Sequence, residues 1–348
     1  MDGSKVLVTG GLGYIGSHTC LELVEAGLQP VILDNLANSK LEVLDRLEEL
    51  GGARPPFFRG DMGDPELLEA VFRQHRIGSV LHFAGLKAVG ESTEQPLRYY
   101  ANNVTGTLGL LEGMRKADVT RLVFSSSATV YGKPDQVPIT ESARLSPTNP
   151  YGRTKHMIEQ ILCDVAAADP GFSAMILRYF NPVGAHPSGL LGEDPLGVPQ
   201  NLVPAIGRVA RGSLDCLRVF GNDYPTQDGT AIRDYIHVED LARGHIRALD
   251  AHQADRGVHV YNLGTGVGHS VLQVVETYRE VSGQAIPWRF DARRPGDIPE
   301  CWADPSKARQ ALGWKSTRGL RDMVADSWRW ESGFSPADGH AGNGDTQR

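Results

Sequence analysis

Two side chains that could exchange a proton lie four residues apart in the stretch 149–155, Asn-Pro-Tyr-Gly-Arg-Thr-Lys. If this stretch opens a helix, Asn149 is a suitable N-cap and Pro150 a suitable first residue, so Tyr151 and Lys155 share one face. A free phenol titrates near ~10, but an adjacent fixed cation favours the phenolate and brings its pKa toward neutral pH. Tyr151 is therefore a candidate general acid and base. Because so short a pattern is also typical of an ordinary helix surface, its context must decide.

The composition of the 348-residue chain is that of a globular protein, with 41% hydrophobic and 22% charged residues. This length allows a large core, and we expect two lobes. A net charge of -7 without a concentrated basic stripe argues against nucleic-acid binding. No signal segment and no run of about 18 apolar residues is present, which predicts a cytoplasmic protein without a membrane partner.

The cysteines and histidines form no recognisable metal site. Cys20, Cys163, Cys216 and Cys301 are far apart in the sequence and are interpreted as reduced thiols. The 11 histidines include no H-x-H or H-E-x-x-H pattern, so isolated residues such as His82 and His186 are interpreted as structural. No metal is expected.

A glycine turn near the N-terminus predicts a dinucleotide site. The apolar run 5–9 is followed by Gly10, Gly13 and Gly16, and then by a helical pattern over 17–26. Such a turn lets the backbone approach a pyrophosphate at a helix N-terminus. The next apolar run ends at Asp34, 18 residues after Gly16, where a ribose-binding acid belongs. Asp34 would repel a 2'-phosphate, which favours NAD over NADP, although Lys40 lies nearby.

The following 150 residues alternate between apolar runs and helical patterns. Runs of strand type lie at 56–61, 79–85, 121–126 and 173–178, and helical patterns lie at 65–75 and 104–116. This rhythm predicts an α/β fold with a doubly wound parallel sheet of Rossmann type, whose ligands bind at the carboxyl ends of the strands. Asp61, Gly85 and Ser126-Ser127 fall at such ends.

The amino-acid composition changes after residue 181, where glycine and proline become frequent. We therefore expect an NAD-binding domain over 1–180 and a smaller α/β substrate-binding lobe over 181–334. Within that lobe, 202–211 is helical in pattern and 215–220 resembles a strand. A helical pattern near 235–250 suggests that about 235–260 returns to the first domain. The tail 335–348 is poor in apolar residues and is expected to be disordered.

From about Val6 to Trp330, the chain resembles the extended short-chain dehydrogenase/reductase family, and within it the UDP-glucose 4-epimerases. Arg153 and Thr154 depart from the usual family pattern Y-G-K-S-K, while Tyr151 and Lys155 are kept. The resemblance rests on six motifs, at 8–18, 34–39, 82–91, 124–132, 179–188 and 234–238.

This resemblance implies an NAD-dependent isomerase that interconverts UDP-glucose and UDP-galactose through a 4-keto sugar. Ser127 would bind the reacting hydroxyl, Tyr151 would exchange its proton, and Lys155 would hold the nicotinamide ribose and the phenolate. NAD would be retained, because the hydride returns to the sugar. The implied cofactor residues are Gly10, Gly13, Tyr14, Ile15, Gly16, Asp34, Asn35, Asn38, Ser39, Asp61, Met62, Phe83, Ala84, Gly85, Lys87, Asn102, Tyr151, Lys155 and Phe180.

The resemblance also implies a substrate site and a homodimer. Arg233 and Arg294 would bind the diphosphate, because guanidinium donors match phosphate oxygens. Cys301 stands where family members restricted to non-acetylated sugars carry tyrosine, which suggests that UDP-GlcNAc and UDP-GalNAc are also accepted. The implied substrate residues are Lys87, Ser127, Tyr151, Asn181, Asn201, Leu202, Arg218, Phe220, Arg233, Arg294, Asp297 and Cys301.

Three other functions compete with this interpretation. A nucleotide-sugar 4,6-dehydratase would need an acid and a base after the active hydroxyl residue, where this chain has Ala128 and Thr129. A UDP-glucuronate 4-epimerase would need a further cation near the sugar. A non-catalytic NAD-binding protein would not be expected to keep Ser127, Tyr151 and Lys155 together.

Overall fold

The computed structural model describes residues 5–197, 199–251, 256–294 and 296–333. The predicted disordered tail, 335–348, lies outside these residues.

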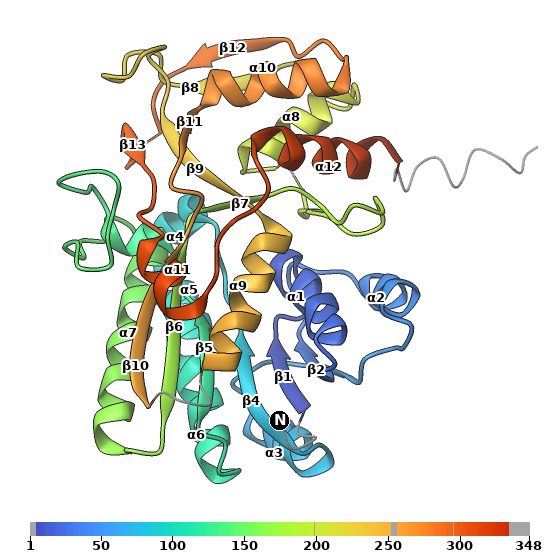
Figure 1. The fold of residues 1–348 in the computed structure, drawn as a ribbon, viewed down its shortest axis with the longest axis vertical. Helices are drawn as coiled ribbons and strands as arrows, with labels where there is room; N and C mark the ends of the chain where they lie inside the picture. The colour runs from blue at the N-terminus through green and yellow to red at the C-terminus, as the bar shows by residue number, and fades with distance from the viewer. Residues whose placement is uncertain (1–4, 198, 252–255, 295, 334–348) are drawn as a thin grey trace, which may run out of the picture.

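A seven-stranded parallel sheet forms the centre of the first lobe (Figure 1). The strand order β10-β6-β5-β4-β1-β2-β3 is that of a doubly wound sheet, which confirms the predicted fold class. Thr9 pairs with Leu33 on one side and with His82 on the other, so three strands end at the same edge. The strands are β1 (Lys5–Thr9), β2 (Pro30–Asp34), β3 (Phe57–Arg59), β4 (Ile77–His82), β5 (Arg121–Ser125), β6 (Ser173–Tyr179) and β10 (Gly257–Leu263).

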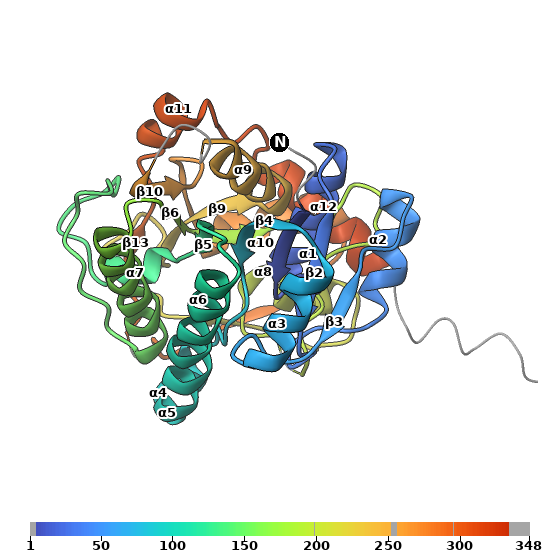
Figure 2. The same cartoon turned by 90° about the horizontal axis from the view of Figure 1, so that it is seen from below.

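Helices cover both faces of this sheet (Figure 2). One apolar cluster joins the sheet to α1 (Tyr14–Glu25), α2 (Val43–Gly51), α9 (Val238–Ala251) and α11 (Ser306–Leu312). A second cluster on the other face joins it to α3 (Pro65–Gln74), α6 (Gly106–Lys116) and α7 (Pro150–Ala168). Because the inner strands are buried on both faces, their sequences are continuous apolar runs rather than alternating ones.

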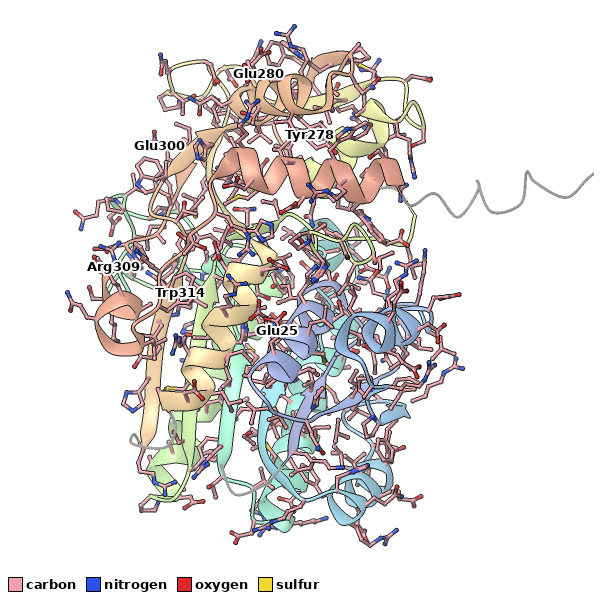
Figure 3. The ribbon with its side chains drawn as sticks, turned by 45° about the vertical axis from the view of Figure 1, so that its right-hand side comes forward. Glu25, Tyr278, Glu280, Glu300, Arg309 and Trp314 are labelled. Carbon is pink, nitrogen blue, oxygen red and sulfur yellow. The ribbon has the colours of Figure 1, made fainter. Side chains whose placement is uncertain are left out.

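The second lobe packs its own apolar core around Tyr278, which Figure 3 labels in the upper part of the molecule. Its strand β9 pairs with β7, β11 and β13, and β8 pairs with β12. The elements are β7 (Asn181–Val183), α8 (Leu202–Ala210), β8 (Leu217–Phe220), β9 (Ile232–His237), β11 (Gly268–Ser270), α10 (Val271–Ser282), β12 (Trp288–Asp291), β13 (Glu300–Cys301) and α12 (Leu320–Gly333).

The chain returns to the first lobe after β9. Helix α9 contacts α1, and β10 is the edge strand of the large sheet next to β6. Trp314, labelled beside α9 in Figure 3, donates its indole N–H to the carbonyl oxygen of Asp240 at 2.8 Å. The first lobe is therefore built from segments that alternate along the chain with those of the second lobe.

The segment between β4 and α6 is more helical than its sequence indicates. It contains α4 (Val89–Glu94), α5 (Pro96–Tyr99) and a π-helical turn (Tyr100–Thr105) that runs directly into α6. A short 3-10 helix (Ala128–Tyr131) follows β5. No helix among the described residues is long and apolar enough to cross a membrane.

Candidate active site

The start of α7 has the predicted geometry. The side chain of Asn149 accepts a hydrogen bond from the Gly152 backbone N–H at 2.8 Å, and Pro150 occupies the first turn. Tyr151 and Lys155 are 6% and 4% exposed, so they do not belong to a solvated helix surface. The N-cap places both side chains beneath the carboxyl ends of the sheet strands.

Lys155 is held by the end of β5. Its Nζ donates to the carbonyl oxygen of Ser125 at 2.8 Å and lies 4.8 Å from the centre of the Phe124 ring. Burial lowers the pKa of Lys155 to about 8, while the charge of Glu159 acts in the opposite direction. The ammonium is therefore closer to losing its proton than that of a solvent-exposed lysine.

The three serines after β5 have different partners. Ser125 Oγ lies 2.8 Å from Nε2 of His245, and Ser126 donates to Glu159 at 2.5 Å. Ser127 Oγ accepts from the Thr129 backbone N–H at 3.2 Å and is also hydrogen-bonded to Tyr151. The first two hydroxyls are committed to buried structural groups, which leaves Ser127 as the serine at the phenol.

The predicted lowering of the Tyr151 pKa is wrong for this structure. Burial raises the pKa of Tyr151 to about 12, and the hydrogen bond with Ser127 only partly opposes this shift. The Lys155 ammonium lies 6.0 Å from the centre of the Tyr151 ring and is bonded to a carbonyl oxygen instead. The loss of water around the phenol outweighs a cation that points elsewhere.

The glycine turn between β1 and α1 has no room for side chains. Gly10 has a φ of 70°, and a Cβ there would lie 2.8 Å from the backbone nitrogen of Ala84. A Cβ on Gly16 would lie 2.3 Å from the carbonyl oxygen of Gly10. The turn therefore keeps its backbone bare at the helix N-terminus, which is the arrangement that a pyrophosphate requires.

Asp34, at the end of β2, is fixed by three donors. Its carboxylate accepts from the Leu12 backbone N–H at 3.0 Å, from the Leu36 backbone N–H at 2.9 Å and from the Ser39 hydroxyl at 2.7 Å. A carboxylate has about four acceptor sites, so capacity remains for a ribose hydroxyl. The carboxylate also lines a cavity, which places that capacity where a ligand can reach it.

One cavity of about 710 Å³ extends from the glycine turn and Asp34 to Tyr151 and Lys155. The residues predicted to bind the cofactor line this cavity, with the exception of Phe180. They are Gly10, Gly13, Tyr14, Ile15, Gly16, Asp34, Asn35, Asn38, Ser39, Asp61, Met62, Phe83, Ala84, Gly85, Lys87, Asn102, Tyr151 and Lys155. Phe180 instead packs in a buried cluster with Cys301, Ala128 and Tyr131.

Several of the residues predicted to bind the substrate meet around Phe220 in the second lobe. The Arg294 guanidinium lies 4.3 Å from the centre of its ring, and that of Arg218 lies 5.2 Å from it. Arg294 is 3.7 Å from the Asp297 carboxylate, and Arg218 pairs with Asp291. Two guanidinium groups thus lie close to the Phe220 ring.

The remaining predicted substrate residues of the second lobe lie on β7, β9 and β13 and at the start of α8. Arg233 on β9 is paired with Cys301 on β13 and donates to the carbonyl oxygens of Ile232 and Pro299. Asn201 is the N-cap of α8, and Leu202 is its first residue. Asn181 begins β7 and is exposed. The cofactor cavity is lined by none of these five side chains, those of Asn181, Asn201, Leu202, Arg233 and Cys301.

Comparison with known proteins places this geometry in a family. The family model for GDP-mannose 4,6 dehydratase matches residues 7–327. The UDP-glucose 4-epimerase of Bacillus subtilis is 57% identical over 94% of this chain and 96% of its own. The chain belongs to the UDP-glucose 4-epimerase family. Its six sequence motifs thus indicated the right relatives.

Two solved structures of this epimerase family agree with the fold. That of Bifidobacterium longum, in complex with NAD⁺ and UDP, has a TM-score of 0.92 and 51% identity, covering 95% of this chain and 98% of its own. The UDP-Glc/GlcNAc 4-epimerase of Campylobacter jejuni has a TM-score of 0.82 and 36% identity, covering 95% and 100%. Both support the description of the first lobe as a Rossmann fold.

The structure also adds cavity residues that are not among the predicted site residues. Tyr179 lies close enough to Tyr151 for its pKa to be raised further by that residue, beyond the effect of burial. The loop 191–195 of the second lobe forms part of the wall, including Glu193 and Asp194. Its charged residues lie in the glycine- and proline-rich stretch, where no periodic pattern indicates an inward-facing side chain.

Proposed function

We propose that the protein is an NAD-dependent 4-epimerase that interconverts UDP-glucose and UDP-galactose. The observation that carries this proposal is a single cavity with a nucleotide-binding turn and Asp34 at one end and Tyr151 and Lys155 at the other. Membership of the epimerase family supports the same reaction. The dehydratase and glucuronate reactions, and NAD binding without catalysis, remain the alternatives.

The residues of the cavity fit NAD. The bare glycine turn would face the pyrophosphate, Asp34 would bind the adenosine ribose, and Lys155 would hold the nicotinamide ribose. When bound, NAD supplies the ring that accepts a hydride from sugar C4 and returns it. Asp34 also favours NAD over NADP, because a 2'-phosphate would meet a buried carboxylate.

Three side chains would handle the proton at the sugar O4. Tyr151 accepts it during oxidation and returns it during reduction, while Ser127, hydrogen-bonded to that phenol, orients the hydroxyl. Because burial raises the pKa of Tyr151, the phenol holds its proton firmly at neutral pH. Deprotonation therefore depends on positive charge near the phenol, and Lys155 is the buried cation nearest to it on its own helix.

The residues next to Ser127 favour epimerisation over dehydration. Ala128 has no ionisable group, and the Thr129 hydroxyl donates to Ser127 Oγ at 3.0 Å. Elimination of water across C5 and C6 needs an acid and a base, and neither residue supplies one. A 4-keto sugar formed in this site would thus take the hydride back rather than lose water.

The substrate nucleotide would be held in the second lobe. In this proposal Phe220 and Asn201 contact the uridine, with Asn181 and Leu202, and the two guanidinium groups of Arg233 and Arg294 bind the diphosphate. Burial raises the pKa of Tyr235 to about 12, and the charges of Arg233 and Arg294 both oppose this shift, which supports assigning the two arginines to one ligand. Arg218 and Asp297 would complete this region through Phe220 and Arg294.

Cys301 would let the site accept N-acetylated sugars as well. It is buried and packs with Phe180 and Ala128, next to the segment that carries Ser127. A cysteine leaves more room here than a tyrosine. We expect Cys301→Tyr to remove turnover of UDP-GlcNAc and UDP-GalNAc while turnover of UDP-glucose and UDP-galactose persists. If the unmodified protein turns over only the non-acetylated pair, this extension of the proposal fails.

A direct experiment tests the main proposal. The nucleotide released from purified protein by denaturation should be NAD, and the protein should convert UDP-galactose to UDP-glucose without added cofactor. Formation of a stable 4-keto-6-deoxy product would show a dehydratase instead. Bound NAD without turnover of any UDP-hexose would favour a non-catalytic protein.

We also propose a homodimer in the cytoplasm. Exposed apolar side chains gather on the mutually packed helices α4, α5 and α7 and on the neighbouring α6. Leu97 is 82% exposed, and Leu108 and Met157 are also exposed. Burying this face against its copy would form a two-fold interface. Light scattering should give twice the monomer mass, and Leu97→Glu with Leu108→Glu should reduce it to the monomer value.

A further inference from the structure

Glu193 receives hydrogen bonds from both lobes on one carboxylate oxygen. Its Oε1 lies 3.2 Å from Lys87 Nζ and 2.8 Å from Asn201 Nδ2. Lys87 follows β4 in the first lobe and lines the cofactor cavity together with Glu193. Asn201 begins α8 in the second lobe, outside that cavity. The Glu193 side chain is 9% exposed and that of Lys87 is 47% exposed, so the carboxylate is shielded from water while the ammonium is partly solvated.

The side chain of Asn201 is committed to this contact. Although Asn201 is the N-cap of α8, its side chain makes no capping hydrogen bond to the helix. Asparagine at an N-cap ordinarily bonds to the N–H groups of the first turn. Here its amide is turned toward Glu193, which links the orientation of the α8 start to a carboxylate at the cofactor cavity.

The backbone of the loop is held independently of the Glu193 side chain. The indole N–H of Trp330 donates to the Glu193 carbonyl oxygen at 3.3 Å. A Cβ on Gly192 would lie 2.5 Å from the Trp330 ring, so the loop lies flat against α12 at this point. Asp194 adds an exposed ion pair with Lys40 of the first lobe at 2.5 Å. Replacing the Glu193 carboxylate should thus leave the loop in place.

We propose that Glu193 is a positioning residue that couples the cofactor site to the substrate nucleotide site. This inference rests on the proposed function, which assigns Lys87 to NAD and Asn201 to the uridine. A UDP group held by Asn201 fixes the chain of contacts from Asn201 through Glu193 to Lys87. Because Lys87 is assigned to NAD, loss of NAD would disturb this chain, so bound UDP should slow that loss. By linkage, the factor by which bound UDP raises the affinity for NAD equals the factor by which bound NAD raises the affinity for UDP.

The test measures loss of NAD from the holoenzyme with and without saturating UDP. The protein is diluted into a scavenger of free NAD, and the NAD that stays bound is followed with time. In the unmodified protein, UDP should slow the loss by at least about fivefold, the lower end of ordinary coupling between sites. In Glu193→Gln this ratio should fall toward one, because the neutral amide can still accept hydrogen bonds but loses the ion pair with Lys87.

Two further variants make the result specific. Lys87→Met breaks the same chain from the cofactor side and should also abolish the effect of UDP. Asp194→Asn removes the adjacent charge from the same loop without touching Asn201, so its ratio should match that of the unmodified protein. Thermal melting of each holoenzyme identifies a variant that has lost its fold. If either Glu193→Gln or Lys87→Met is unfolded, the other one tests the proposal.

Three outcomes would overturn parts of this reasoning. If UDP does not slow NAD loss, or if Glu193→Gln keeps the full ratio, the inference is refuted while the proposed function stands. If the ratio behaves as expected but no UDP-hexose is epimerised, the proposed function fails and the coupling survives. If the protein binds neither NAD nor UDP, both are refuted.

Discussion

Replacing Tyr151 by phenylalanine removes one oxygen and leaves the buried ring. The lost hydrogen bond with Ser127 should cost about 0.5–1.5 kcal/mol of stability, so the variant should fold. NAD should also stay bound, because Lys155 and the glycine turn are unchanged. The substitution should instead slow the chemical step. Among the described residues, Tyr151 is the phenol that is hydrogen-bonded to Ser127, and the variant lacks it.

The expected loss can be bounded. Proton transfer by a positioned side chain contributes about 10²- to 10⁴-fold. This corresponds to about 2.7–5.4 kcal/mol in the activation barrier. We therefore expect kcat for UDP-galactose to fall by that factor, measured in a coupled assay of UDP-glucose formation. The KM should change little, because the proposed function places the nucleotide in the second lobe.

Tyr99→Phe is the matched control. The Tyr99 phenol is also buried, and its hydroxyl donates to Glu91 at 2.7 Å, but it does not line the cavity. Its removal should leave kcat close to that of the unmodified protein. Unchanged turnover in Tyr151→Phe, or an equal loss in both variants, would refute the assignment of Tyr151 as the proton-exchanging group.

Three further predictions concern Lys155 and the neighbouring Glu159. Because burial lowers the pKa of Lys155 to about 8, its ammonium loses a proton above that pH. The value of kcat/KM should therefore decline as the pH rises through 8. A pH profile without this decline would contradict the role of Lys155. The effect of Lys155 on the free energy of unfolding has the opposite sign. Between pH 8 and the ordinary lysine pKa near 10.5, the unfolded chain binds more protons at this residue than the folded one. The contribution of Lys155 to stability should therefore increase as the pH rises through this range. Glu159→Gln should lower the free energy of unfolding by about 3–5 kcal/mol, because it leaves the Arg178 guanidinium buried without its bidentate partner. Urea denaturation measures this change. A loss below about 1 kcal/mol would show that the ion pair is dispensable.

Local patterns predicted most of the first lobe. The strands β1 and β2 have the predicted bounds, because runs such as 5–9 are buried on both faces and carry no competing signal. The stretch 89–105 was not predicted as helical. Pro96 and several polar residues interrupt its periodicity, and its helices are stabilised instead by packing against α7.

Properties that depend on distant residues could not be predicted in this way. The Tyr151 pKa follows from complete burial, which no five-residue pattern reveals. Glu193 bonds to Lys87 across 106 positions of sequence, from a loop whose composition indicates only turns. A glycine turn or an N-cap is specified by its own neighbours, whereas these contacts exist only after the two lobes have folded together.

The division of labour between the lobes explains how one site could treat both faces of a sugar alike. Charged and aromatic groups, such as Arg294 and Phe220, lie where the nucleotide would bind, and they can hold it firmly. Around the proposed sugar position the neighbours of Ser127 are small or neutral, including Ala128 and Cys301. A 4-keto sugar there has few fixed partners, so it can turn while its nucleotide stays in place. The hydride can then return to either face of the 4-keto sugar, because the nucleotide is held by more contacts than the sugar. No second catalytic group is needed.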